Sequence, residues 1–299
     1  MSAAGQVLAG ATILGVVVGL VGARPVLGGL DALSVRVLLL GVLVAAVSTA
    51  ACAVRWRLVA GELGVPLRLP VAVAACYRAQ LLNTLLPAGV LGDVDRGLAH
   101  GRASGRTGVA LRAVAWERTA GQVVQAAVTG LVLVLVPSPW GDLLPAALVV
   151  VLVVVAGVAL VALAPRVRGE LRVALAVRRV WPGVVVASVV ALACHVTTYV
   201  LVARAVGVSA PTATLVPLAL VVLLAAGLPL NVAGWGPREG MAVWASSAAG
   251  LGASAGLATS VAYGAVVLVA NLPGLAVLAA HGTAAAVRTP VRSGGGSRA

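Results

Sequence analysis

LLNTLLPAGVLGDVDRG (residues 81–97) and LLAAGLPLNVAGWGPREG (residues 223–240) are two versions of one pattern. Shifted by 142 positions, they share six residues in the frame L-L-x3-L-P-x4-G-x3-R. In each stretch an apolar run ends at a proline, passes through a glycine-containing break and reaches an arginine within nine residues. We interpret the pair as an internal repeat built around Pro87 and Pro229.

The composition places the chain in a membrane. Hydrophobic residues make up 61% of its 299 residues and charged residues 10%, and the mean hydropathy is +1.11. A soluble domain of this length cannot bury that much apolar surface, so the sequence predicts a polytopic membrane protein. The net charge of +13 comes from arginines in the short segments between apolar runs. This distribution is typical of cytoplasmic loops and predicts cytoplasmic termini in a bacterial plasma membrane, without a nucleic-acid partner.

The predicted fold class is all-α, with about six full transmembrane helices and two re-entrant hairpins. The predicted spans cover approximately residues 7–21, 37–54, 109–136, 143–163, 184–202 and 257–280. Runs 71–86 and 215–230 end at the two prolines and are predicted to enter the membrane and return. The segment 240–256 is too weakly apolar to assign. We expect one membrane domain over 1–285 and a disordered cytoplasmic tail over 286–299.

Counting these crossings places the two proline breaks on opposite faces of the membrane. Three predicted spans separate Pro87 from Pro229. An odd number of crossings inverts the second copy of the repeat relative to the first. Inverted repeats around broken helices are the plan of many transporters.

Each break supplies free backbone N–H groups, a helix N-terminus and an arginine, Arg96 or Arg238. Helix ends and guanidinium groups both favour a phosphate, so these arginines are candidate ligand-binding residues. The alternative is that they anchor the chain at the lipid headgroups. Asp93 is expected to pair with a neighbouring arginine in preference to holding a cation. Glu239 follows Arg238 directly and is expected either to neutralise a neighbour or to relay a proton.

Ionisable residues inside a span are costly and face a cavity or a partner. Glu117 and Arg118 lie within the predicted span 109–136, and Gln122, Gln125 and Thr129 continue the stripe of Arg118 along one helix face. The stripe either lines a path for a polar substrate or forms a salt bridge between helices. His195 is expected to form a hydrogen bond between helices. Arg55-Trp56-Arg57 is expected in the headgroup region at the end of a span.

The sequence predicts no cofactor, metal site or catalytic constellation. The three cysteines are isolated, without a CxxC or Cys/His cluster. G-x-S-x-G, H-E-x-x-H and the P-loop pattern are all missing.

The ordered motifs Gln80–Pro87, Gly92-Asp93-x-x-Arg96, Glu117-Arg118, Leu228-Pro229 and Gly234-x-Gly236-x-Arg238-Glu239 carry a family resemblance. Together they resemble the lysylphosphatidylglycerol synthase transmembrane region, also called the flippase-like integral membrane family. One departure is Val90-Leu91, where the family usually places a further glycine before Gly92. The resemblance implies a site made of Asn83, Asp93, Arg96, Glu117, Arg118, Arg238 and Glu239; the stripe adds Gln122.

The resemblance also implies a membrane domain that binds or moves lipid-linked substrates. In two-domain members this region is thought to flip aminoacylated phosphatidylglycerol made by a separate cytosolic synthase domain. We expect this chain to lack that synthase domain. We therefore expect a protein that binds, and translocates, an anionic phospholipid or polyprenyl-phosphate-linked lipid. Two alternatives remain at this point: an intramembrane transferase acting on a lipid-linked donor, and a membrane scaffold that transports nothing.

Overall fold

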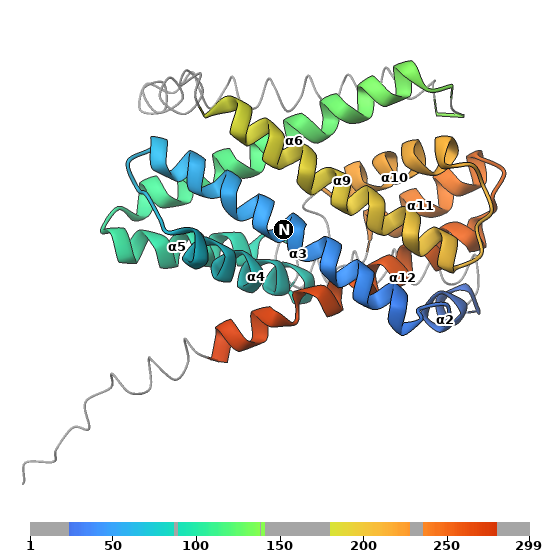
Figure 1. Ribbon diagram of the computed structural model, residues 1–299, viewed down its shortest axis with the longest axis horizontal. Helices are drawn as coiled ribbons and strands as arrows, with labels where there is room; N and C mark the ends of the chain where they lie inside the picture. Colours follow the sequence, from blue (N-terminus) through green and yellow to red (C-terminus); the bar gives the residue numbers. More distant parts are fainter. Residues whose placement is uncertain (1–23, 87–88, 138, 141–179, 228–235, 280–299) are drawn as a thin grey trace, which may run out of the picture.

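The computed structural model describes residues 24–86, 89–137, 139–140, 180–227 and 236–279 (Figure 1). All regular secondary structure in these ranges is α-helical, which confirms the predicted all-α class. The predicted spans 7–21 and 143–163, Pro87, Pro229 and the C-terminal tail lie outside the described residues.

Within the described residues, four helices are long and apolar enough to cross a membrane. They are α3 (Val35–Glu62), α6 (Thr107–Leu135), α9 (Trp181–Ala205) and α12 (Ala253–Asn271), whose candidate span extends to Ala279. A span needs about 20 residues at 1.5 Å per residue. The described part of the chain therefore contains four of the expected crossings, and the protein is a polytopic membrane protein.

Two pairs of shorter helices lie at the positions of the predicted hairpins. α4 (Leu69–Leu85) and α5 (Leu91–Ser104) form the first hairpin; α10 (Thr212–Ala226) and α11 (Pro237–Ala248) form the second. The longest of these helices has 17 residues, a length of about 25 Å, which is less than the thickness of the hydrocarbon core. Each hairpin thus has the dimensions of a re-entrant element.

The helices of the two halves occur in the same order: long, short, short, long. The first helices of the halves, α3 and α9, pack against each other in antiparallel directions (Figure 1). Ser48 lies beside His195, and Arg55, further along α3, lies beside Ser188, which is earlier in α9. This antiparallel contact is the geometry that the predicted inverted repeat requires.

Each hairpin also touches the last long helix of the other repeat, α6 or α12. Gln122 on α6 donates a hydrogen bond to the carbonyl of Gly227, at the end of α10 (3.1 Å). Asn271 at the end of α12 donates to Thr84 on α4 (3.2 Å). The ends of both hairpins that lead into the breaks therefore face the middle of the molecule (Figure 1).

The apolar core is divided between the two repeats. One buried cluster surrounds Trp56 and joins α3, α4, α6 and the start of α9. The other surrounds Tyr199 and Tyr263 and joins the end of α9 to α10, α11 and α12. Within the first hairpin, a side chain at Gly92 would collide with the backbone of Ala79, so glycine allows α5 to lie close against α4.

The structure corrects the prediction for Arg55-Trp56-Arg57. α3 does not end there but continues to Glu62, and both Arg55 and Trp56 are buried among helices. The span 109–136 matches α6, and 184–202 lies inside α9. The unassigned segment 240–256 contains most of α11, whose low apolar content reflects its place in a hairpin.

Candidate functional site

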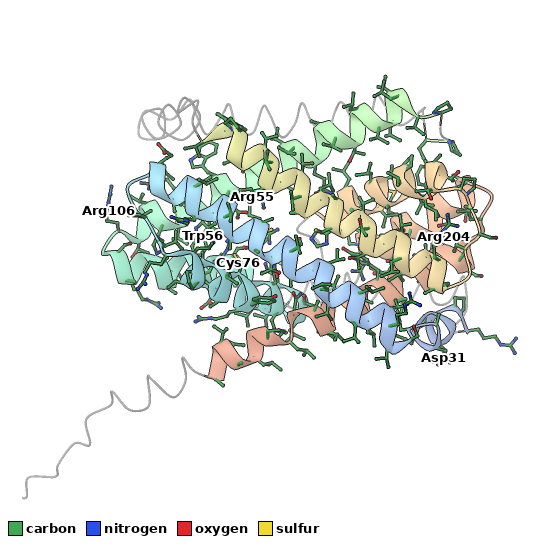
Figure 2. All side chains as sticks on the ribbon, in the orientation of Figure 1. Asp31, Arg55, Trp56, Cys76, Arg106 and Arg204 are labelled. Atoms are coloured by element: carbon green, nitrogen blue, oxygen red, sulfur yellow. The ribbon has the colours of Figure 1, made fainter. Side chains whose placement is uncertain are left out.

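A cavity of about 600 Å³ lies between the two repeats. Both hairpins and all four long helices contribute to its lining. Figure 2 labels two of its lining residues, Arg55 on α3 and Cys76 on α4, in the part of the molecule that carries the first hairpin. The cavity is therefore built at the junction of two separately packed cores.

The lining combines polar and apolar side chains. Its uncharged polar groups include the amides of Gln80, Asn83, Gln122 and Gln125. Its apolar groups include Val26, Leu30, Leu223, Val261, Val267 and Leu268. Such a cavity suits an amphiphilic molecule better than a wholly polar solute.

Five charged residues of the first repeat form a continuous chain of alternating charge. Glu117 joins two arginines: Arg55 Nη2 lies 2.5 Å from Oε1, and Arg96 Nη2 lies 2.6 Å from Oε2. Arg96 Nε also donates to Asp93 Oδ1 at 2.9 Å. Asp93 Oδ2 then accepts from Arg118, whose Nε lies 2.8 Å away. We call Arg55, Glu117, Arg96, Asp93 and Arg118 the charge chain.

Local helix geometry and one cap position the charge chain. Asp93 and Arg96 stand three residues apart on α5, so they share a face and pair. Asn83 at the end of α4 accepts a hydrogen bond from the Gly92 N–H (2.8 Å) and donates to Asp93 Oδ2 (2.8 Å). One amide thus satisfies a free N–H at the start of α5 and orients the carboxylate beside it.

The inner arginines are held by further contacts. Arg55 Nη1 donates to Ser188 on α9 (3.1 Å), and the guanidinium of Arg96 lies 4.7 Å from the ring centre of Trp56. Because a buried charge is tolerated only when it is paired and hydrogen-bonded, these contacts explain how two arginines remain inside the helix bundle.

Arg118 differs from the other arginines of the cavity in its exposure. Its side chain is 44% exposed, compared with 10% for Arg55 and 4% for Arg96. Its Nη1 forms no hydrogen bond within the described part of the chain, whereas Nε and Nη2 bind Asp93. Arg118 is therefore the guanidinium of the charge chain with free donors for a ligand.

The second repeat contributes a self-contained pair, Arg238 and Glu239. Arg238 Nη2 lies 2.5 Å from Glu239 Oε1, and Ser260 on α12 donates to the same oxygen (3.1 Å). Glu239 Oε2 accepts the Gly236 N–H (2.8 Å) and so caps α11. The guanidinium of Arg238 lies 5.4 Å from the ring centre of Tyr263, a cation–π distance.

His195 connects three long helices beside the cavity. Its Nε2 lies 3.2 Å from Ser48 Oγ on α3, and its Nδ1 lies 2.8 Å from the Tyr263 hydroxyl on α12. The predicted interhelical hydrogen bond of His195 is thereby confirmed.

The structure brings the eight predicted site residues together around one cavity. Seven of them line the cavity: Asn83, Asp93, Arg96, Glu117, Arg118, Gln122 and Arg238. The eighth, Glu239, pairs with Arg238 directly behind it. The expected ion pairing of Asp93 is confirmed. The sequence reasoning missed Arg55, Gln80 and Ser188 as lining residues. For Arg55 a signal existed: no proline interrupts the helix pattern between it and Glu62.

The charges of the described residues around the cavity do not cancel. Four arginines (Arg55, Arg96, Arg118 and Arg238) face three carboxylates (Asp93, Glu117 and Glu239). One positive charge is left, and Arg118 is the arginine that exposes it. Within the described residues, no group of three or more His, Cys, Asp or Glu side chains has the arrangement of a metal site.

Comparison with known proteins gives one match. A family model described as "Lysylphosphatidylglycerol synthase TM region" matches residues 5–274. No curated protein and no solved structure matches the chain.

Proposed function

The chain belongs to the lysylphosphatidylglycerol synthase TM region family, and from this premise we propose that its central cavity binds the headgroup of a membrane lipid and carries it across the bilayer. That it is an integral membrane protein follows from the family and from its four apolar spans. Binding and translocation are the proposal.

The observation that carries the proposal is that arginines from both hairpins line one cavity. Arg96 comes from the first hairpin and Arg238 from the second, and the antiparallel contact of α3 with α9 relates the two halves. A site at the junction of two inverted repeats can open to either side when one repeat moves against the other. This arrangement suits a carrier of a polar headgroup.

The cavity dimensions support a headgroup as the ligand. Small-molecule sites typically have about 300–1,000 Å³, and the cavity has about 600 Å³. That volume accommodates a phosphate with a small polar substituent, while two acyl chains need more room. The apolar lining at Val26, Leu30 and Leu268 offers the chains a route towards the bilayer.

The contacts of the arginines suggest a division of roles. Arg96 and Arg238 were candidates for direct binding, but each already pairs with a buried carboxylate. We assign them to positioning the two hairpins. Arg118, with its exposed guanidinium, is the residue proposed to bind the phosphate.

A vesicle assay tests the proposal. Purified protein would be placed in liposomes that contain fluorescent phospholipids or polyprenyl-phosphate lipids, and transbilayer movement would be followed by quenching from outside. We expect movement with the wild type and a loss of about tenfold with Arg118→Gln, because the substitution removes a charge-assisted contact.

The matched control is Arg102→Gln, which removes an equally charged side chain from an exposed position on α5 that does not line the cavity. This variant should move lipid at the wild-type rate. If wild type and Arg118→Gln moved every lipid no faster than empty vesicles, the translocation proposal would be wrong. Formation of a new covalent lipid product instead would identify a transferase.

The orientation in the membrane is also proposed. We place both termini in the cytoplasm and the two breaks on opposite faces of a bacterial plasma membrane, because the arginine-rich segments then lie inside. Single cysteines at positions 102 and 235, in a chain without its native cysteines, would be labelled with impermeant reagents. Labelling of both from one side would exclude the inverted orientation.

A further inference from the structure

We infer that the headgroup accepted by this cavity carries a phosphate and neutral hydroxyl groups, and that a cationic aminoacyl group is rejected. The inference rests on the proposed function and names its substrate class. Two kinds of lipid have this headgroup chemistry: a phospholipid with a polyol headgroup, and a polyprenyl phosphate that carries a sugar.

The uncompensated charge of the cavity favours an anionic group. The charge chain has three arginines and two carboxylates, and the Arg238–Glu239 pair is neutral. An unbalanced charge is unfavourable among buried helices. A phosphate monoanion at the exposed Arg118 guanidinium would balance it, so the described charges around the cavity are electrostatically complementary to one negative charge.

No carboxylate of the described residues is left to receive a cation. Glu117 binds two arginines, and Asp93 binds two arginines and Asn83. Both oxygens of Glu239 are used, by Arg238, Ser260 and the Gly236 N–H. The remaining described carboxylates, Asp31, Glu62 and Asp95, do not line the cavity. Among the described residues, an ammonium group bound here would therefore find no free carboxylate as a counter-ion, and it would face Arg118.

The remaining polar lining consists of amides, which suit hydroxyl groups. Gln122 and Gln125 follow Arg118 on the same face of α6, and Gln125 lies roughly 10 Å from Arg118 along the helix. An amide offers both donors and an acceptor, as a hydroxyl does. The Gln125 side chain forms no hydrogen bond within the described part of the chain, so its amide remains available for the distal part of a headgroup.

The test compares phosphatidylglycerol with its lysyl ester, which differ by the lysyl group alone, and adds a polyprenyl lipid that carries a sugar. Binding to the purified protein in detergent would be measured by native mass spectrometry with phosphatidylglycerol, lysylphosphatidylglycerol and a hexose-linked polyprenyl phosphate. We expect phosphatidylglycerol to bind at least about tenfold more tightly than its lysyl ester, because the lysyl ammonium groups would meet the Arg118 guanidinium with no free carboxylate among the described lining residues. Comparison of phosphatidylglycerol with the polyprenyl lipid distinguishes the two lipid sources. Tight binding of either lipid, each of which combines a phosphate with neutral hydroxyl groups, supports the inference.

Equal or tighter binding of lysylphosphatidylglycerol would overturn the inference while leaving the proposed function intact. Failure of all three lipids to bind would instead overturn the proposed function and the inference with it. The two failures are therefore distinguishable.

Gln125→Glu provides a second test, which predicts a changed preference between two lipids and not only a loss of binding. The substitution keeps the shape of the side chain and adds the missing carboxylate. We expect it to weaken binding of phosphatidylglycerol and to strengthen binding of the lysyl ester, each by about tenfold. Arg102→Gln changes the net charge by the same amount outside the cavity and should leave both affinities unchanged. An unchanged preference in Gln125→Glu would contradict the assigned place of the headgroup.

Discussion

In the first repeat the hairpin arginine meets a carboxylate on the following long helix, whereas in the second it meets an aromatic ring. Arg96 pairs with Glu117, the eleventh residue of α6, and Arg238 lies over Tyr263, the eleventh residue of α12. The next residue is Arg118 in α6 and Gly264 in α12. The eleventh and twelfth residues of the long helix therefore carry an ion pair and an exposed cation in one half, and neither in the other.

The difference shows that a repeated backbone can hold an asymmetric charge distribution. In the first repeat Glu117 binds a second arginine, Arg55 from α3, in addition to Arg96, and Arg118 is presented to the cavity. The second repeat neutralises its arginine with the neighbouring Glu239 and closes the pair against a ring. We attribute anion binding to the first repeat, and the second forms the opposite wall.

Glu117→Gln should cause the largest loss. The substitution leaves two buried guanidiniums, Arg55 and Arg96, without their shared counter-ion, and breaking a buried ion pair typically costs about 3–5 kcal/mol. Glu239→Gln removes the partner of one arginine, and its amide oxygen can still accept the Gly236 N–H, so about 1–3 kcal/mol is expected. Chemical unfolding in detergent micelles would compare them. Equal losses would contradict the asymmetry.

Two glycines allow the arginines of the repeats to be displaced separately. A Cβ at position 121 would lie within 3.0 Å of three atoms of the Arg55 guanidinium, whereas one at position 264 would approach only Nη2 of Arg238 that closely. Gly121→Ala should therefore destabilise the protein by about 1–3 kcal/mol. Gly264→Ala should cost less, because only one atom of the Arg238 side chain would have to move; the helix propensity of alanine, about 1 kcal/mol, offsets part of the cost in both variants. A larger loss in Gly264→Ala would reverse this comparison.

Tyr263→Phe separates the two roles of the tyrosine in the second repeat. The ring remains over Arg238, while the hydrogen bond to His195 Nδ1 is lost. Loss of one such bond is expected to lower the free energy of unfolding by about 1 kcal/mol. Lipid movement should stay near the wild-type rate. A collapse of transport in this variant would show that the second repeat carries more of the function than we assign to it.

Arg118→Gln should have the smallest effect on stability. The guanidinium is 44% exposed, and Asp93 keeps Arg96 and Asn83 as partners, so the loss is expected below about 1 kcal/mol. The same variant should lose about tenfold in anionic-lipid binding. Thermal unfolding and lipid binding measured on one preparation would check both. If the variant lost stability and lipid binding together, the result would show that Arg118 maintains the fold and is not a ligand-binding residue.

The helices and hairpins could be predicted because their causes are local. Run length separates α6 and α9 from the shorter α4 and α10, and each short run stops shortly before the proline of a repeat motif, a residue that is disfavoured inside a helix although α10 contains one at Pro217. α11 could not be assigned, because a hairpin helix facing other protein need not be strongly apolar.

The pairing of charges could not be predicted, because it depends on packing between distant segments. Glu117 and Arg55 are 62 positions apart and meet only because α3 and α6 are neighbours. The sequence placed Arg55 at the headgroups because a tryptophan lies between two arginines there, and it assigned ligand binding to Arg96 and Arg238. The exposed guanidinium is that of Arg118, a distinction that burial alone determines.

The most direct measurement is an experimental structure of the protein in lipid nanodiscs that contain phosphatidylglycerol. We predict headgroup density in the central cavity, with phosphate oxygens within hydrogen-bonding distance of Arg118 and the glycerol hydroxyls beside Gln122 and Gln125. Density for acyl chains alone beside Arg118, with its guanidinium bound only to Asp93, would contradict the account.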